Sequence, residues 1–166
     1  MKKPGKGATE SGTDESPARQ LATFIAKFDP AVARVIRECR VVLRKRFPTA
    51  IVLVYDNYNF FVIGYCAAAR ASTCIVSLAA AANGEGLSFY HGATLPDPHK
   101  LLLGSGKQNR FIRLPSAATL SAPAVAALID AAVAQASVPL PETGKGTLII
   151  QSISATQRPR RSASGV

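Results

Sequence analysis

The sequence predicts an α+β fold, in which an antiparallel sheet of about five strands is packed by helices on one face. Three observations indicate this class. Two proline-initiated amphipathic segments come first, runs rich in valine, isoleucine and aromatic residues follow, and an alanine-rich helical segment comes last. The apolar runs are joined by short turns, and strands joined in that way pair antiparallel, since parallel neighbours need a long crossover.

The first two helices are predicted from their start signals. Ser16-Pro17 places a capping serine before a proline at the first helical position, and a short helix should follow as far as Lys27. Asp29-Pro30 repeats the signal and opens a helix over 30–47, which Pro48 ends.

The helix over 30–47 is predicted to be amphipathic, with an apolar face on the core and an arginine face in water. Its apolar face consists of Val32, Val35, Ile36, Cys39, Val42 and Leu43. Its basic face consists of Arg34, Arg37, Arg40 and Arg44, with Glu38 as the one acidic residue of the helix.

The sheet is predicted from β-branched and aromatic runs bounded by turn residues. Asn83-Gly84 is a hairpin signal between the third and fourth runs. After the fifth run, Ser121 is predicted to cap the last helix, over 123–136. The five predicted strands are 50–55, 60–66, 73–80, 86–91 and 107–114.

Both ends of the chain are predicted to be tails around one domain. Residues 1–17 combine Lys, Gly, Ser, Thr and Glu without apolar periodicity, which is typical of disorder. Residues 18–138 form the predicted α+β domain. Residues 139–166 are predicted to be a flexible basic tail. It contains an apolar island at 147–153, and whether this island docks on the sheet as an edge strand is left open.

Charge, cysteine spacing and the length of the apolar runs indicate what kind of partner and location to expect for the protein. The formal net charge is +10, of which +6 falls on residues 21–138 and +3 on residues 139–166. Such a charge attracts anionic partners. The three cysteines have no CxxC spacing, and no apolar run approaches the roughly 18 residues of a membrane helix. The pattern therefore predicts a cytoplasmic protein that does not span a membrane.

The clearest local motif is the loop before the fifth predicted strand. Gly104, Ser105 and Gly106 allow backbone N–H groups to converge on an anion, and Lys107 and Arg110 add positive charge. The loop is not a P-loop, because leucine takes the place of its first glycine and the motif leads into a strand. An anion site is the functional hypothesis, and a tight turn with solvated basic residues is the structural alternative.

A second polar group lies between the first two predicted strands. Asp56 and Tyr58 could line the mouth of a pocket, with Asp56 paired to Arg110 or Arg113 across the sheet. The alternative is a turn in which Asn and Asp side chains bond to their own backbone.

No metal centre or catalytic set is predicted. His91, Asp97 and His99 form a weak pattern for a metal, and no cysteine accompanies them. No Ser/His/Asp or Cys/His set has the spacing of a nucleophilic site. We therefore expect no cofactor, and a non-enzymatic protein is favoured over an enzyme.

Nucleic acid is a further possible partner. The basic helix face and Arg158, Arg160 and Arg161 supply charge, and strand aromatics could stack on bases. The alternative is that these aromatics belong to the core and that the arginines are a solvated surface.

The chain also resembles a known family over nearly all of residues 20–137. The Phe47-Pro48-Thr49-Ala50 segment and the run Leu102-Leu103-Gly104-Ser105-Gly106-Lys107 with Arg110, Ile112 and Leu114 are similar to the YdhG-like domain-of-unknown-function family. The resemblance implies a compact α+β fold of the frataxin-like group in a bacterial cytoplasmic protein, and it brings no reaction. Some relatives are discussed as iron chaperones on account of acidic surface residues, whereas this chain has Ile51 and Val52 where an acidic residue is usual.

The leading hypothesis is a non-enzymatic binding module for an anionic partner. It would use the loop 104–110 and the exposed Arg34, Arg37 and Arg44, assisted by the tail. The alternatives are a small-molecule or metal chaperone-like protein with Asp56, His91 and His99 near a pocket, and a nucleic-acid binder. The oligomeric state is not predicted.

Overall fold

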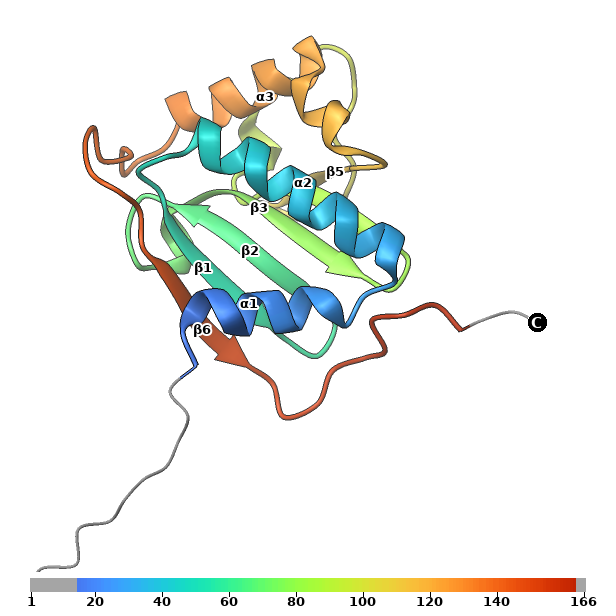
Figure 1. Cartoon of the computed structure of the whole chain (residues 1–166). Coiled ribbons are helices and arrows are strands. Elements are labelled where there is room, and N and C mark those ends of the chain that lie inside the picture. Colours follow the sequence, from blue (N-terminus) through green and yellow to red (C-terminus); the bar gives the residue numbers. More distant parts are fainter. Residues whose placement is uncertain (1–14, 164–166) are drawn as a thin grey trace, which may run out of the picture.

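The computed structural model describes residues 15–163, which form three α-helices over one six-stranded sheet (Figure 1). Of the predicted tail 1–17, residues 1–14 lie outside the described residues. Pro17, the last residue of that predicted tail, is the first residue of α1. The helices are α1 (Pro17–Ala26), α2 (Pro30–Arg46) and α3 (Pro123–Ala134). The strands are β1 (Ile51–Asp56), β2 (Phe61–Cys66), β3 (Cys74–Ala81), β4 (Gly84–Phe89), β5 (Arg110–Arg113) and β6 (Leu148–Ile153). Among residues 15–163, no helix is long and apolar enough to cross a membrane.

The strands of the sheet follow the order β5-β4-β3-β2-β1-β6, and the three helices cover one face (Figure 1). The α+β prediction is confirmed. Strands β1 to β5 pair antiparallel with their neighbours, as their short connections require. The predicted number of strands was one too few, since β6 adds to the outer side of β1 in parallel.

The alternation of side chains in β2 shows how the two faces of the sheet differ. Phe61, Ile63 and Tyr65 point towards the helices and are at most 3% exposed. Val62 and Gly64 occupy the intervening positions on the opposite face, which no helix covers in Figure 1. The same alternation in the neighbouring strands gives an open face rich in small residues.

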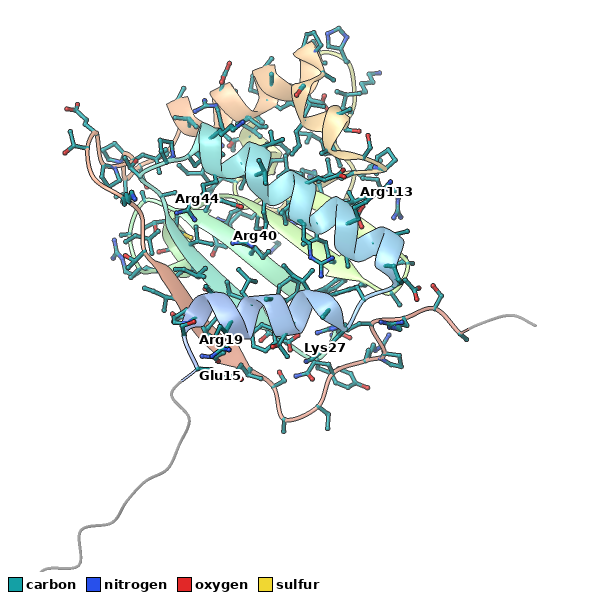
Figure 2. All side chains as sticks on the ribbon, in the orientation of Figure 1. Glu15, Arg19, Lys27, Arg40, Arg44 and Arg113 are labelled. Atoms are coloured by element: carbon teal, nitrogen blue, oxygen red, sulfur yellow. The ribbon has the colours of Figure 1, made fainter. Side chains whose placement is uncertain are left out.

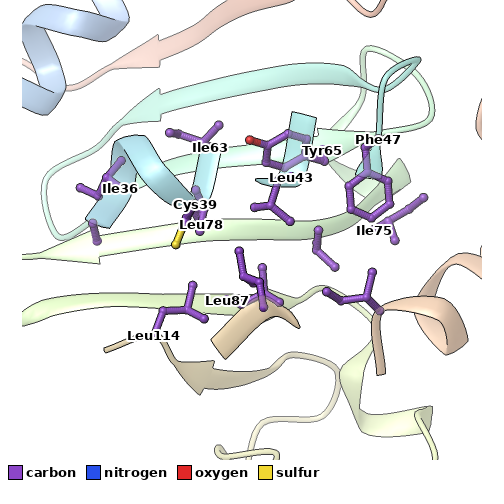
Figure 3. Close-up of a cluster of buried hydrophobic side chains, with 14 of the residues drawn as sticks. Ile36, Cys39, Leu43, Phe47, Ile63, Tyr65, Ile75, Leu78, Leu87 and Leu114 are labelled. Atoms are coloured by element: carbon purple, nitrogen blue, oxygen red, sulfur yellow. The ribbon is translucent and has the colours of Figure 1, made fainter. Parts of the chain in front are cut away.

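The core lies between the sheet and the helices (Figure 3). Ile36, Cys39 and Leu43 reach down from α2 at helical spacing, as predicted, and each is at most 1% exposed. A cluster of three aromatic rings joins α1 to the sheet, with Phe61 centred 6.1 Å from Phe24 and 5.8 Å from Phe28. Burial of such rings is the main favourable term that holds α1 and α2 on the sheet.

The three helices begin where they were predicted to begin, but only one of the predicted capping side chains makes its hydrogen bond. The Ser16 side chain accepts a hydrogen bond from the Arg19 backbone at 3.3 Å, as predicted. Asp29 is the N-cap residue of α2, but its side chain makes no capping hydrogen bond, and its carboxylate accepts two hydrogen bonds from Ser162. The predicted Ser121 cap is wrong: Ser121 ends a 3₁₀ turn, and α3 begins after Ala122 without a side-chain cap.

Part of the segment 139–166, which was predicted to be a flexible tail with an apolar island that could dock, forms an edge strand of the sheet. Leu148–Ile153 is β6, and Leu148 and Ile150 pack against the core. The following residues continue across the end of the sheet, where the Arg158 backbone donates to the Tyr58 carbonyl at 2.8 Å. Apolar side chains at alternate positions drive this docking, because they cover an edge of the core that α1 and β1 leave open.

Candidate anion-binding site

The predicted anion loop is an exposed turn attached to the sheet edge. Leu103 exchanges two backbone hydrogen bonds with Phe111, at 2.8 and 3.0 Å, and Gly104 turns the chain with φ +107°. Ser105, Gly106 and Lys107 are exposed. The Arg110 guanidinium donates to the backbone carbonyls of Gly106 and Asn109 and so closes the loop on itself. The loop therefore has the geometry of a tight turn, the alternative to an anion site, and Lys107 is exposed to solvent.

Asp56 does not lie near this loop. It is at the end of β1, with three strands between β1 and β5, and the predicted pairing with Arg110 or Arg113 is wrong. The Asp56 carboxylate is 1% exposed and lies 2.6 Å from Lys27 Nζ and 3.0 Å from an Arg160 nitrogen. It is therefore part of a buried ion cluster inside the fold.

Of the three predicted tail arginines, Arg160 is not a surface residue, since it is 4% exposed. Besides Asp56, its guanidinium donates to the backbone carbonyls of Asn57 and Asn59, and it lies over the Phe28 ring at 5.8 Å. Arg161 donates to the carbonyls of Ala26 and Lys27 at the end of α1. Arg158 is exposed and lies 5.6 Å from the ring of Tyr58, which is half exposed. The basic tail is thus largely used in closing the fold.

The basic face of α2 remains as a charged surface. Arg34 and Arg37 are exposed, and Arg34 has only a loose contact of 3.7 Å to Glu38. Arg46 pairs with Asp130 of α3 at 2.8 Å. Arg40, which is half-buried, and Arg44, which is exposed, extend into the space between α2 and α1, above β1 and β2 (Figure 2).

Arg40 and Arg44 line a small cleft at the C-terminal end of α2. Its open volume is about 30 Å³, which suits a single small group. The floor is Tyr65 of β2, and one wall is the segment at Gly146 that leads into β6. Besides these four residues, the cleft is lined by Phe47, Pro48, Ala50, Val52 and Leu148.

The electrostatics of the cleft favour an anion. Burial lowers the pKa of Arg40, and the neighbouring charge of Arg44 lowers it further, whereas contact with the Tyr65 hydroxyl opposes both effects. Burial raises the pKa of Tyr65 to about 12, so this hydroxyl is neutral at pH 7. No acidic side chain of residues 15–163 forms an ion pair with Arg40 or Arg44. Two neighbouring guanidinium groups that lack a carboxylate partner can together bind phosphate or carboxylate oxygens.

The sequence placed Arg40 on the solvated face of the helix and did not include it among the site residues. A signal was present, because Arg40 follows the buried Cys39 and lies one turn before Arg44. That spacing puts both side chains on one edge of the apolar face, where a long side chain can lie along the sheet. The strands that complete the cleft are remote in sequence, so the cleft itself had no local signal.

The open face of the sheet carries a second hollow, of about 520 Å³. Its floor consists of small side chains of β3 and β4, including Ser77, Ala79 and Ser88. Phe60 and Phe111 also line it. The volume and the apolar lining with a few polar groups are typical of small-molecule sites.

The weak metal pattern is not assembled by the fold. The Asp97 carboxylate accepts hydrogen bonds from the backbone of Leu101 and Leu102, both at 2.9 Å. His91 Nδ1 lies 2.9 Å from the Gln108 amide nitrogen. Across the described part of the chain, no three His, Cys, Asp or Glu side chains are grouped as a metal would require.

Comparison of the chain with models of protein families, with curated proteins and with solved structures found no match. The resemblance to the YdhG-like family stays a prediction.

Proposed function

We propose that the protein is a binding module for an anionic ligand, held by its phosphate or carboxylate group between Arg40 and Arg44. The observation that carries the proposal is the half-buried Arg40, for which residues 15–163 supply no ion pair. A guanidinium withdrawn from water is stabilised by an anion that accepts its hydrogen bonds.

The surroundings of the cleft support the same ligand. Arg40 and Arg44 repel each other across one helical turn, and a bound anion would relieve that repulsion. The Tyr65 hydroxyl can donate a hydrogen bond to a ligand oxygen, since its raised pKa keeps it protonated. The net charge of +10 would draw anions to the surface and speed their encounter with the cleft.

The first prediction is that Arg40→Gln with Arg44→Gln weakens binding of inorganic phosphate and pyrophosphate at least tenfold, about 1.4 kcal/mol. Each replacement removes a charge-assisted donor from the cleft. Isothermal titration calorimetry on the full chain measures the change. The matched control is Arg34→Gln with Arg37→Gln, which removes the same charge from the exposed side of the same helix.

The control variant should keep its affinity within about twofold at moderate salt, because exposed charges act only through a screened field. Equal losses in both pairs would mean that binding follows net charge, and the cleft would then not be the site. The same titration with short single-stranded RNA tests the nucleic-acid alternative. In that case both pairs of replacements should weaken binding and make it less dependent on salt, because fewer phosphates are neutralised.

A second candidate function is binding of a small aromatic acid in the hollow of the open face. The specific observation is that Arg113 lines the same hollow as Phe60 and Phe111, so an apolar body and an acidic group have complementary surfaces there. Among residues 15–163, Arg113 has no ion pair. Aromatic walls and one charged group are a common design of such sites.

The second prediction uses 1-anilinonaphthalene-8-sulfonate, an aromatic sulfonate, as the probe. The native protein should enhance its fluorescence, and Ala79→Leu should reduce that signal at least threefold, because a larger side chain would fill the floor of the hollow. Ala71→Leu, at an exposed position outside the hollow, is the control. An unchanged signal in Ala79→Leu, with an unchanged melting temperature, would place the dye elsewhere.

A further inference from the structure

Two cysteines oppose each other on neighbouring strands of the sheet. Cys66 ends β2, Cys74 begins β3, and the two are direct partners in the antiparallel register. A register shift next to Cys66 leaves Ile75 without a partner and brings Cys74 opposite Cys66. The register of β2 and β3 therefore places the two cysteines directly opposite each other.

Both sulfur atoms converge over Gly64. A Cβ atom at Gly64 would lie 3.2 Å from Cys74 Sγ and 3.6 Å from Cys66 Sγ. Gly64 lies between Ile63 and Tyr65, whose side chains face the helices, so the two sulfurs lie on the open face. The absence of a side chain at position 64 leaves the space that they occupy.

The backbone geometry fits a disulfide. Residues directly opposite each other in antiparallel strands have Cα atoms about 4.5–5.5 Å apart. Disulfides span Cα separations of about 4.4–6.8 Å. The pair can therefore be joined without separating β2 from β3.

The two thiols differ in reactivity and access. A hydrogen bond between them lowers the pKa of Cys66 and raises the pKa of Cys74. Cys66 is 1% exposed, while Cys74 is partly exposed and gives the pair its contact with solvent. Cys39 is different, since it lies on the helix side of the sheet in the core, and burial raises its pKa to about 11.

We propose that Cys66 and Cys74 form a dithiol site that hydrogen peroxide oxidises to an intramolecular disulfide. One sulfur, as its thiolate, attacks a peroxide oxygen; the O–O bond breaks, and the leaving hydroxide takes a proton to become water. The second sulfur then attacks the resulting sulfenic acid, the S–O bond breaks, and a second water leaves. In total, two thiols and one peroxide give one disulfide and two waters.

The experiment treats the native full chain with hydrogen peroxide, alkylates the remaining thiols in urea with iodoacetamide, and digests the protein with trypsin without reduction. The sequence separates the three cysteines, because cleavage after Arg37, Arg40, Arg46, Arg70 and Lys100 places each one in a different peptide. Mass spectrometry should find peptides 47–70 and 71–100 joined and Cys39 alkylated. Two of the three alkylatable thiols are then lost, and dithiothreitol restores both.

Cys66→Ser and Cys74→Ser serve as paired controls, and each should abolish the linked peptide without involving Cys39. Retention of three alkylatable thiols after peroxide treatment would overturn the proposal. A link to Cys39, or sulfinic acid at Cys66 in place of the disulfide, would overturn it as well. Oxidation in urea, where the strands are not paired, shows whether the preference for the 66–74 pair depends on the fold.

Discussion

Replacing Arg160 with methionine is expected to lower the free energy of unfolding by about 3–5 kcal/mol, the usual effect of removing one partner from a buried ion pair. Arg160 and Asp56 are both nearly inaccessible to water, at 4% and 1% exposure. Without the guanidinium, Asp56 would keep Lys27 as its one cation among the described residues. The carbonyls of Asn57 and Asn59 would each lose the hydrogen bond that Arg160 donates to them.

Urea unfolding followed by circular dichroism measures this loss. Arg158→Met is the matched control, since Arg158 has the same charge but is exposed beside Tyr58, and it should change stability by less than about 0.5 kcal/mol. Combining Arg160→Met with Asp56→Asn should cost less than the sum of the two single changes, because no buried carboxylate then lacks its partner. A loss below about 1 kcal/mol in Arg160→Met would show that the ion cluster contributes little.

Replacing Gly146 with alanine is expected to destabilise the fold by about 3 kcal/mol, the upper end of the usual range for an overpacked site. A Cβ atom at this position would lie 1.6 Å from the carbonyl oxygen of Ala50 and 2.5 Å from its carbonyl carbon. Both are backbone atoms, so no rotamer change can relieve the contact. The chain would have to move away, which breaks the hydrogen bond from Gly146 N to Pro48 O and shifts the start of β6.

Gly106→Ala is the control for Gly146→Ala, because nothing lies within 4 Å of the Cβ position of Gly106. It should be neutral within about 0.5 kcal/mol. Hydrogen exchange should also show faster exchange of the Val52 amide in Gly146→Ala, since that amide donates to Thr147 O at 2.8 Å. Equal stability of the two variants would mean that the segment before β6 accommodates a side chain without loss.

The elements predicted from sequence were those with local signals. Proline and its preceding cap residue mark the start of α2, and 3.6-residue spacing of Ile36, Cys39 and Leu43 marks its buried face. Asn83-Gly84 marks the β3–β4 hairpin, where Gly84 has φ +129°. β6 has no such signal, because it pairs with β1 in parallel across nearly a hundred residues. The apolar island at 147–153 does not indicate which strand it pairs with or in which direction it runs.

The sequence suggested arginines as anion-binding residues, but it did not indicate the cleft at Arg40 as their place. The arginine content of α2 indicated an anionic partner, which stays a prediction. The expectation that arginines are exposed placed Arg160 on the surface, because long basic side chains are buried only when they are paired. Its partner Asp56 is 104 residues away, a distance at which sequence patterns carry no information.

The ion cluster at Asp56 has a consequence for how the protein is made. β1 and Asp56 emerge from the ribosome long before β6 and Arg160, so the early chain has an unpaired sheet edge and a carboxylate that lacks one of its two cations. An open strand edge is a site of aggregation. The nascent chain can therefore collapse early around α1, α2 and the hairpins. The sheet and the ion cluster are complete only after residues 148–160 have been synthesised. A ribosome stalled before residue 148 would hold a chain whose β1 edge is unpaired and whose Asp56 lacks Arg160.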